Sequence, residues 1–388
     1  MIRDTVSREL IMPACSRMVV QFFLLSVLFP ACSFAQSVSF ASPQLYGVGQ
    51  NPDAVAAADF NHDGKQDLAV ANSGGDGGTI SILLGRGDGT FEPAVNYAVG
   101  PDPSAIVVAD FNGDHNPDLA VGNGGGETVS ILLGNGDGTL QPARDFPSGF
   151  EPFSVKTADF NHDGKLDLAI ANGNNNTVSI LLGNGDGTFQ ARQTIAVANS
   201  PFALALGDFN RDGNVDIVTA NYSFYVSPGT VTVLLGNGDG TFQPPVSYPA
   251  GQHPYYVVVG KFKRNHVEDL AVIDYDLHLV NILIGRGDGT FSTPVSYPVG
   301  MNPFAVVVED FNGDHALDLA TSNWGDGTVS VLLGNGNGTF QNALSFPAGQ
   351  SPEYFAAGDF NGDHKPDLAV PLYGGGTNQV AVLLNTTP

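Results

Sequence analysis

The stretch that decides the fold is Asp59-Phe-Asn-His-Asp-Gly-Lys-Gln-Asp-Leu68, because the chain repeats its pattern at a nearly constant interval. Further copies start at Asp110, Asp159, Asp208, Asp310 and Asp359, and a damaged copy starts at Lys261. Successive starts lie 51, 49, 49, 53, 49 and 49 residues apart. A period of about 50 residues indicates a repeat architecture in which each copy is one supersecondary unit.

Each repeat is predicted to form four short strands. In the first repeat these span residues 54–58, 67–71, 79–84 and 94–99. A glycine-rich turn follows the third strand and recurs at Leu83–Phe91, Leu132–Leu140, Leu181–Phe189, Leu234–Phe242, Leu283–Phe291 and Leu332–Phe340. Glycine supplies the positive φ that such a turn needs. No segment sustains a helical period of 3.6 residues, so the unit is interpreted as a four-stranded propeller blade.

The two ends of the chain predict a closed ring. The last repeat stops after its third strand, residues 379–384, whereas the stretch Phe40–Gly49 matches the fourth strands at Phe91–Gly100 and Phe291–Gly300. Pairing the two ends in one blade removes an open sheet edge. We therefore predict an all-β, seven-bladed β-propeller over residues 36–388, with four-stranded blades and an N-terminal strand that completes the last blade.

Residues 1–35 are predicted to be a secretion signal peptide. Three arginines, Arg3, Arg8 and Arg17, precede the apolar run Met18–Phe29, and Ser33-Phe-Ala35 offers a small-residue cleavage site. A run of about 12 apolar residues is too short to span a bilayer, so no transmembrane segment is expected in the mature chain. The expected location is extracellular or in the cell envelope.

Two alternatives remain for this segment. Asp4 and Glu9 are unusual in the basic part of a signal, so translation could start at Met12 instead. Cys32 weakly resembles a lipid-attachment site, which is the alternative to free secretion. Both cysteines, Cys15 and Cys32, precede the expected cleavage after Ala35, so a mature chain would have no disulfide and no thiolate metal site.

The charge of the chain excludes two classes of partner. Asp and Glu number 39 against 15 Lys and Arg, which gives a formal net charge of −24. Such a chain repels nucleic acid and anionic membranes, so no nucleic-acid partner is expected.

Six of the acidic loops are predicted to bind Ca²⁺. Positions 1, 3, 5 and 9 carry oxygen-bearing side chains, and position 7 can offer its carbonyl, which suits the six to eight oxygen ligands of Ca²⁺. The expected ligands are Asp59, Asn61, Asp63, Lys65 and Asp67; Asp110, Asn112, Asp114, Asn116 and Asp118; Asp159, Asn161, Asp163, Lys165 and Asp167; Asp208, Asn210, Asp212, Asn214 and Asp216; Asp310, Asn312, Asp314, Ala316 and Asp318; Asp359, Asn361, Asp363, Lys365 and Asp367.

An EF-hand and acidic turns that bind no metal are the other interpretations of these loops. An EF-hand would need Glu at position 12, where Val70 and its equivalents lie in the next strand. Acidic turns that bind nothing are the simplest alternative, but packed carboxylates without a cation repel one another. His115, His315 and His364 are interpreted as exposed turn residues, since one position in each loop is expected to need positive φ.

The fifth loop departs from the pattern. Lys261 and Lys263 replace two oxygen ligands, and Asn265 and Asp269 complete the set, so no Ca²⁺ is expected there. A lysine paired with Asp269 could hold this loop without a metal, and a functional basic site is the alternative.

The repeated motifs resemble the FG-GAP/VCBS repeats that also build integrin α-subunit propellers. The resemblance rests on Asp-Phe-Asn-x-Asp-Gly-x-x-Asp-Leu loops and Gly-Asn-Gly-Asp-Gly-Thr-Phe turns, and it covers essentially all of residues 36–388. It implies Ca²⁺ at the six loops and an extracellular setting. It implies no single function, because one fold hosts many functions.

A ligand is expected on the face opposite the acidic loops, where sequence and loop length vary between blades. Aromatic side chains beside carboxylates suit stacking on sugar rings or on a peptide. The alternative is that these aromatics merely pack between blades. The candidate residues are Asp53, Phe153, Phe202, Tyr222, Tyr225, Tyr255, Phe304, Trp324, Glu353 and Tyr373.

Three functions are compatible with these patterns. The first is a calcium-binding, lectin-like binding or cell-adhesion module for carbohydrate or an extracellular protein. The second is an extracellular polysaccharide lyase or hydrolase, for which His253 near Glu353 or Asp53 is the best candidate general base. The third is a purely structural envelope protein. Arg86-Gly-Asp88 and Arg286-Gly-Asp288 are interpreted as turn variants rather than recognition motifs, because other blades have Asn-Gly-Asp there.

Overall fold

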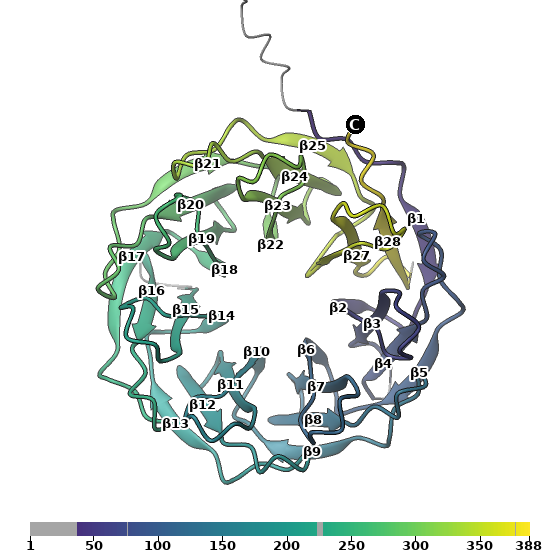
Figure 1. The fold of residues 1–388 in the computed structure, drawn as a ribbon, viewed down its shortest axis with the longest axis horizontal. Coiled ribbons are helices and arrows are strands. Elements are labelled where there is room, and N and C mark those ends of the chain that lie inside the picture. The colour runs from purple at the N-terminus through teal and green to yellow at the C-terminus, as the bar shows by residue number, and fades with distance from the viewer. Residues whose placement is uncertain (1–36, 76, 223–227, 377) are drawn as a thin grey trace, which may run out of the picture. The chain divides into compact units, whose positions relative to one another are not determined.

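The computed structural model describes residues 37–75, 77–222, 228–376 and 378–388. Seven four-stranded antiparallel sheets surround a central channel as the blades of a propeller (Figure 1). No helix occurs in these described ranges. The predicted signal peptide, with Cys15 and Cys32, lies outside the described residues, as does Tyr225. The predicted seven-bladed, all-β fold is confirmed.

The strands fall into four concentric sets. The innermost strands are β2 (Pro52–Ala58), β6 (Pro103–Ala109), β10 (Pro152–Ala158), β14 (Pro201–Gly207), β18 (Pro254–Gly260), β22 (Pro303–Glu309) and β26 (Ala356–Gly358). The second strands are β3 (Asp67–Asn72), β7 (Asp118–Asn123), β11 (Asp167–Asn172), β15 (Asp216–Asn221), β19 (Asp269–Asp274), β23 (Asp318–Asn323) and β27 (Asp367–Leu372).

The outer half of each blade is built in the same way. The third strands are β4 (Thr79–Leu83), β8 (Thr128–Leu132), β12 (Thr177–Leu181), β16 (Gly229–Leu234), β20 (Leu279–Leu283), β24 (Thr328–Leu332) and β28 (Gln379–Leu383). The outermost strands are β5 (Val95–Ala98), β9 (Arg144–Pro147), β13 (Gln193–Ala196), β17 (Val246–Gly251), β21 (Val295–Pro298), β25 (Leu344–Pro347) and β1 (Gln44–Gly47).

Burial follows these sets and explains the sequence pattern. Every residue of the second strands is buried, because neighbouring blades cover both faces of the sheet there, so these strands are nearly continuous apolar runs. The outermost strands are largely exposed and mix polar with apolar residues, such as the exposed Val95 of β5. The hydrophobic core is therefore divided into seven clusters that lie between blades, such as the one containing Phe60, Ile80 and Leu119.

The ring closes as the sequence predicted. Strand β1 pairs antiparallel with β28, with Leu45 opposite Ala381, and completes the seventh blade. Elsewhere the Gly-Asp-Gly turn of one blade donates a backbone hydrogen bond to the acidic loop of the preceding blade, as from Gly138 to the Phe60 carbonyl. The last blade lacks that turn, and the side-chain amide of Asn385 donates to the Phe311 carbonyl in its place, at 2.9 Å.

Candidate functional site

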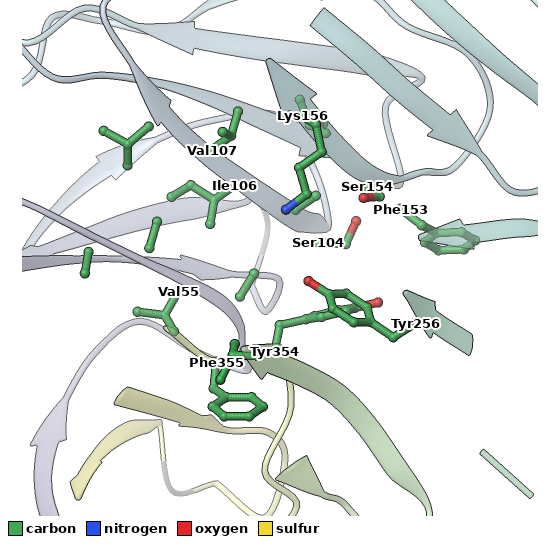
Figure 2. Close-up of a pocket in the computed structure, with 17 residues that line it drawn as sticks. Val55, Ser104, Ile106, Val107, Phe153, Ser154, Lys156, Tyr256, Tyr354 and Phe355 are labelled. Carbon is green, nitrogen blue, oxygen red and sulfur yellow. The ribbon is translucent and has the colours of Figure 1, made fainter. Parts of the chain in front are cut away.

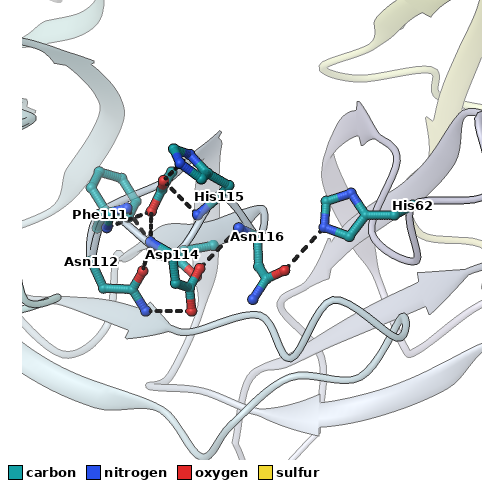
Figure 3. A network of polar contacts seen from close by, with 9 residues as sticks. His62, Phe111, Asn112, Asp114, His115 and Asn116 are labelled. Atoms are coloured by element: carbon teal, nitrogen blue, oxygen red, sulfur yellow. Dashed lines mark hydrogen bonds and ion pairs between the residues drawn. The ribbon is translucent and has the colours of Figure 1, made fainter.

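The acidic loops hold their side chains in place through their own backbone. Asp59 accepts hydrogen bonds from the amides of Asp63 (3.1 Å) and Gly64 (2.8 Å), and Asp63 accepts one from the amide of Lys65 (3.0 Å). Figure 3 shows the same network in the second loop, where Asp114 accepts from the Asn116 amide. The carboxylates at positions 1 and 5 are thus oriented before any ligand arrives.

Each of the six loops contains two left-handed positions, so the expectation of one was wrong. In the first loop these are His62 (φ 58°) and Gly64 (φ 80°), and in the second they are Gly113 (φ 77°) and His115 (φ 67°). Glycine takes one position of the pair, and His or Arg tolerates the other. The side chains of His115, His315 and His364 are 94–96% exposed, which confirms their interpretation as surface turn residues.

The position-9 aspartates connect each loop to the rest of its blade. Asp67 is completely buried, and its two carboxylate oxygens accept hydrogen bonds from the amides of Phe60 (2.8 Å) and Gly85 (2.7 Å). A Cβ on Gly85 would lie 2.1 Å from the Gln66 carbonyl, so only glycine brings its amide this close. Asp269 accepts the equivalent pair from Phe262 and Gly285 although its loop has lost the other acids. Every repeat has Asp at position 9, even the damaged fifth one. This constancy was the sequence signal for a structural role as a hydrogen-bond acceptor, which was not predicted.

Negative charge accumulates where these aspartates approach the loop. Burial, with the charges of Asp63 and Asp59 adding to it, raises the pKa of Asp67 to about 6. The same causes raise the pKa of Asp118, Asp216 and Asp367 to about 6 and that of Asp318 to about 7. A divalent cation would relieve this repulsion, and the all-oxygen donor set suits a hard ion.

No group of three or more His, Cys, Asp or Glu side chains is drawn together as a metal would need within the described ranges. The position-9 carboxylates face their backbone amides, whereas the carboxylates of positions 1 and 5 accept the amides of the loop itself. In three loops the Oδ1 atom of the position-1 carboxylate accepts two amides, as Asp110 does from Gly113 and Asp114, so its Oδ2 atom is the one that keeps a lone pair. The oxygen atoms of each loop that could coordinate a metal ion are therefore those of the two carboxylates, the asparagine side chain and the position-7 carbonyl.

The fifth loop is held by other contacts. Lys261 lies 3.9 Å from a carboxylate oxygen of Glu268. The lysine whose charge acts on Asp269 is Lys263, although burial is the larger effect and raises the pKa of Asp269. The second oxygen of Glu268 accepts the amide of Asp208 from the neighbouring loop at 2.7 Å. Only His266 is left-handed in this described loop (φ 59°), so its backbone follows a different path.

A β-bulge positions the candidate ligand residues on the opposite face. In six blades the hydrogen-bonded register shifts between the first proline of the innermost strand and the residue two places on, as between Pro52 and Ala54. The skipped residue is turned away from the regular strand pleat. These residues are Asp53, Ser104, Phe153, Phe202, Tyr255 and Phe304.

Four of these side chains form a continuous aromatic arc, Phe153–Phe202–Tyr255–Phe304. Successive ring centroids lie 4.5, 4.8 and 4.8 Å apart, and the first pair is stacked at 13°. These four rings therefore pack against one another across blades, and each remains half-buried. Tyr222 and Tyr275 pack on the outside of the arc, at 5.3 Å from Phe202 and Tyr255 respectively. Trp324 stands apart from the arc and is 39% exposed.

The remaining three blades present polar residues instead of aromatics. Asp53 and Glu353 share a hydrogen bond, and burial raises the pKa of both carboxyl groups. The Oδ1 atom of Asp53 is buried without a hydrogen-bond partner in the described structure. The mouth of the channel is thus aromatic on one side and acidic on the other.

A cleft of about 480 Å³ opens on the acidic side. Asp53, Asp102, Glu151, Phe150 and Tyr373 contribute to its lining, together with Ser104 and Phe153. Asp53, Phe153 and Tyr373 are among the predicted ligand residues, whereas Asp102, Phe150 and Glu151 were not predicted. A signal was present: the connections and second-to-third loops of this face contain no Lys or Arg in the sequence, while they carry Asp102, Glu127, Glu151, Asp276 and Asp326.

His253 lies beside a different acid from those predicted. Its Nδ1 atom is 2.7 Å from the Asp276 carboxylate, a distance typical of an ion pair, although the angle is not that of a hydrogen bond. Its ring also lies 5.3 Å from that of Tyr222. No contact with Asp53 or Glu353 is found for His253 in the described part of the chain.

Comparison with known proteins identifies the repeat and the fold. A model of the FG-GAP-like repeat matches residues 59–121, 110–170, 162–219, 267–321 and 316–370. No curated protein matches the sequence. Among the residues that the structure describes, there is no helix both long and apolar enough to cross a membrane.

Three solved structures illustrate the similarity. BBS1N, solved in complex with ARL6DN, has a TM-score of 0.61 at 16% identity, covering 90% of this chain and 97% of that chain. A periplasmic gluconolactonase from Pseudomonas aeruginosa has a TM-score of 0.58 at 15% identity, with 76% and 85% covered. Virginiamycin B lyase from Staphylococcus aureus, solved with quinupristin, has a TM-score of 0.57 at 12% identity, with 89% and 99% covered. At these identities the similarity is one of fold alone.

Proposed function

The chain belongs to the FG-GAP-like repeat family, and on that premise we propose that it is a secreted, calcium-stabilised binding module. Its ligand, a carbohydrate or an extracellular protein, would bind on the face opposite the acidic loops. Residues 1–35 would direct export and be removed after Ala35. N-terminal sequencing of exported protein checks this step, and a mature chain that starts at Gln36 is the expected result.

Calcium would bind at the six acidic loops and neutralise their carboxylates. Support comes from the loops' all-oxygen donors and from the raised pKa of their position-9 aspartates, such as Asp67. Because an ion that binds only the folded state stabilises it, EGTA is expected to lower the melting temperature of calcium-loaded protein. Calcium titration of the chelated protein should reach about six ions per chain. Loaded protein whose melting curve does not respond to EGTA would refute this part of the proposal.

The observation that carries the binding role is the cleft at the acidic side of the channel mouth. Carboxylates of Asp102 and Glu151 lie there beside the aromatic rings of Phe150, Phe153 and Tyr373. A concave site with aromatic walls and a few polar groups is the usual form of a ligand pocket. Carboxylates can accept hydrogen bonds from sugar hydroxyls or pair with the basic side chains of a protein.

Glycan and peptide arrays probed in the presence of Ca²⁺ test this role. Saturable binding should be lost in the double variant Asp102→Asn/Glu151→Gln and weakened in Trp324→Ala. The charge-matched control is Asp137→Asn/Asp186→Asn, which alters two exposed turns on the acidic-loop side. Binding that is unchanged in the cleft variant would exclude the cleft, and release of a product from a polysaccharide would favour the enzymatic alternative instead.

A further inference from the structure

A second cavity lies inside the central channel. It has a volume of about 340 Å³ and is walled by the innermost strands β2, β6 and β10, with Tyr256, Tyr354 and Phe355 on the other side (Figure 2). Most of the wall is Ala and Val, including Ala54, Val55 and Val107. The side chains of this cavity are therefore mostly small and apolar, and the neighbouring channel cavity is lined by Glu309 as well as by Lys156.

One charged side chain interrupts this wall. Lys156 occupies a position whose equivalents in the other six blades, matched by strand register, are Ala56, Val107, Ala205, Val258, Val307 and Ala356. Within the described ranges no ion pair or hydrogen bond involves the Lys156 ammonium group. A cation beside apolar walls is unfavourable unless a counter-charge accompanies it.

Hydroxyl groups accompany this ammonium group. Figure 2 shows the Lys156 nitrogen and the hydroxyl oxygens of Ser104 and Tyr256 turned toward the same space. The Tyr354 hydroxyl is hydrogen-bonded to Tyr255 instead. The Tyr256 and Tyr354 rings lie 5.4 Å apart and narrow the channel at this level. One cation and the Tyr256 hydroxyl thus lie together in a cavity whose side chains are mainly Ala and Val.

The cavity adjoins the cleft on the binding face. Ser104 and Phe153 line both spaces, because the bulged residue of each innermost strand lies where the channel opens. The opening lies where the aromatic arc ends. Its rim carries Asp53, Asp102 and Glu151, which oppose the approach of multiply charged anions.

We infer that the channel cavity is a binding site for a small organic monocarboxylate, whose single charge pairs with Lys156 and whose apolar body contacts the Ala and Val walls. One cation matches one negative charge, whereas the acidic rim disfavours phosphate dianions. The Tyr256 hydroxyl can donate to the second carboxylate oxygen, whereas the Ser104 hydroxyl donates to the Pro152 carbonyl at 3.3 Å. This site shares Ser104 and Phe153 with the cleft of the proposed function, but Lys156 lines only the cavity and Asp102 and Glu151 line only the cleft, so variants of these residues distinguish failure of one from failure of the other.

Isothermal titration calorimetry of the calcium-loaded full chain with sodium hexanoate tests the inference. Hexanamide, a neutral analogue of the same shape, and inorganic phosphate serve as comparison ligands. Hexanoate should bind about tenfold or more tightly than either one. Lys156→Met should weaken hexanoate binding by about tenfold or more, and Lys156→Arg should retain it. Arg144→Met removes an exposed cation on outermost strand β9 and should leave binding unchanged.

The variant is expected to fold, since it replaces an unpaired cation with an apolar side chain. Its melting temperature without ligand should equal or exceed that of the wild type. The inference is overturned if hexanoate fails to bind the wild type at millimolar concentration. Equal binding to Lys156→Met, or equal affinity for hexanamide, would also overturn it.

Discussion

A buried aspartate holds the base of every acidic loop, independently of whether that loop keeps its other acids. In each blade the position-9 carboxylate accepts two backbone amides, one from its own loop and one from the segment after the third strand. An unsatisfied buried amide is costly, so this contact alone explains why Asp269 persists beside Lys261 and Lys263. The same residue type can therefore serve as scaffold in all seven loops.

Asp269→Asn should destabilise the protein by about 1–3 kcal/mol, because an amide group can accept only one of the two hydrogen bonds. The loss should be equal with Ca²⁺ and with EGTA, since no ion is expected in the fifth loop. Chemical denaturation in both conditions measures it, with the exposed turn variant Asp288→Asn as control. A loss that appears only with Ca²⁺ would contradict the structural role of Asp269.

The acidic pair at the channel mouth predicts a pH dependence. Burial raises the pKa of Asp53 to about 7 and that of Glu353 well above its usual range. An unfolded Asp titrates near pH ~3.9, so between about pH 4 and pH 7 the folded state holds protons that the unfolded state releases. The free energy of unfolding contributed by this pair therefore falls as the pH rises through that window.

Asp53→Asn should flatten this dependence, because an asparagine amide can donate to Glu353 without titrating. From about pH 5 to about pH 8 the variant should lose less stability than the wild type, by on the order of 1–3 kcal/mol. Urea denaturation at fixed Ca²⁺ concentration measures the difference. Asp137→Asn, on an exposed turn, is the control, and parallel profiles for Asp53→Asn and wild type would argue against a proton held at the mouth.

At the scale of the element, the fifth loop differs from the other six both in its backbone conformation and in its oxygen-bearing side chains. The six loops of the common pattern have two left-handed residues, whereas the described fifth loop has only His266. Its backbone also forms a bridge between Lys263 and Asn337 of the next blade. Under the proposed calcium role, a fifth loop that binds a metal ion would require both the oxygen ligands and the backbone path of the other six.

The variant Lys261→Asp/Lys263→Asn/Arg264→Gly/Asn265→Asp copies the common pattern into the fifth loop. The added glycine can take the missing left-handed position. We expect the variant to bind one Ca²⁺ more than the wild type, about seven in place of about six, by calcium titration of chelated protein. Lys261→Gln/Lys263→Gln removes the cations without adding acids and should gain no ion. An unchanged count in the fourfold variant would mean that other parts of the blade limit the site.

At the scale of the whole molecule, stability depends on closing the ring between the first and last strands. Strand β1 supplies the outermost strand of the last blade, and Asn385 replaces the missing turn. Asn385 is 1% exposed and also donates to the Pro366 carbonyl at 3.2 Å. One side chain therefore connects the end of the chain to the sixth blade.

Asn385→Ala leaves the Phe311 and Pro366 carbonyls without this donor and should cost about 1–3 kcal/mol. Thermal and urea unfolding should show a lower stability with one cooperative transition. Asn335→Ala removes an exposed hydrogen bond to Thr339 in a turn and should change stability little. Equal effects of the two variants would mean that the closure contact of Asn385 is unimportant.

Repeat spacing and residue type were enough to predict the blades, their number and the shared blade at the closure. These features depend on local pattern: strand alternation, glycine at turns and copies in register. The strand bounds differ by only one or two residues, as in β2, which begins at Pro52 rather than Ala54. The expected exposure of His115 and its equivalents also follows from local backbone geometry.

Contacts between blades could be decided only by tertiary structure, because each joins residues about 50 or more positions apart. The bulge after each proline turns Phe153, Phe202, Tyr255 and Phe304 against one another, which no single repeat reveals. Lys156 is unusual because the equivalent residues of the other six blades are Ala or Val, and the ring places all of these positions around one channel. Sequence determines what each blade is, and the closed ring determines which side chains of different blades meet, since ring closure alone brings them to one channel.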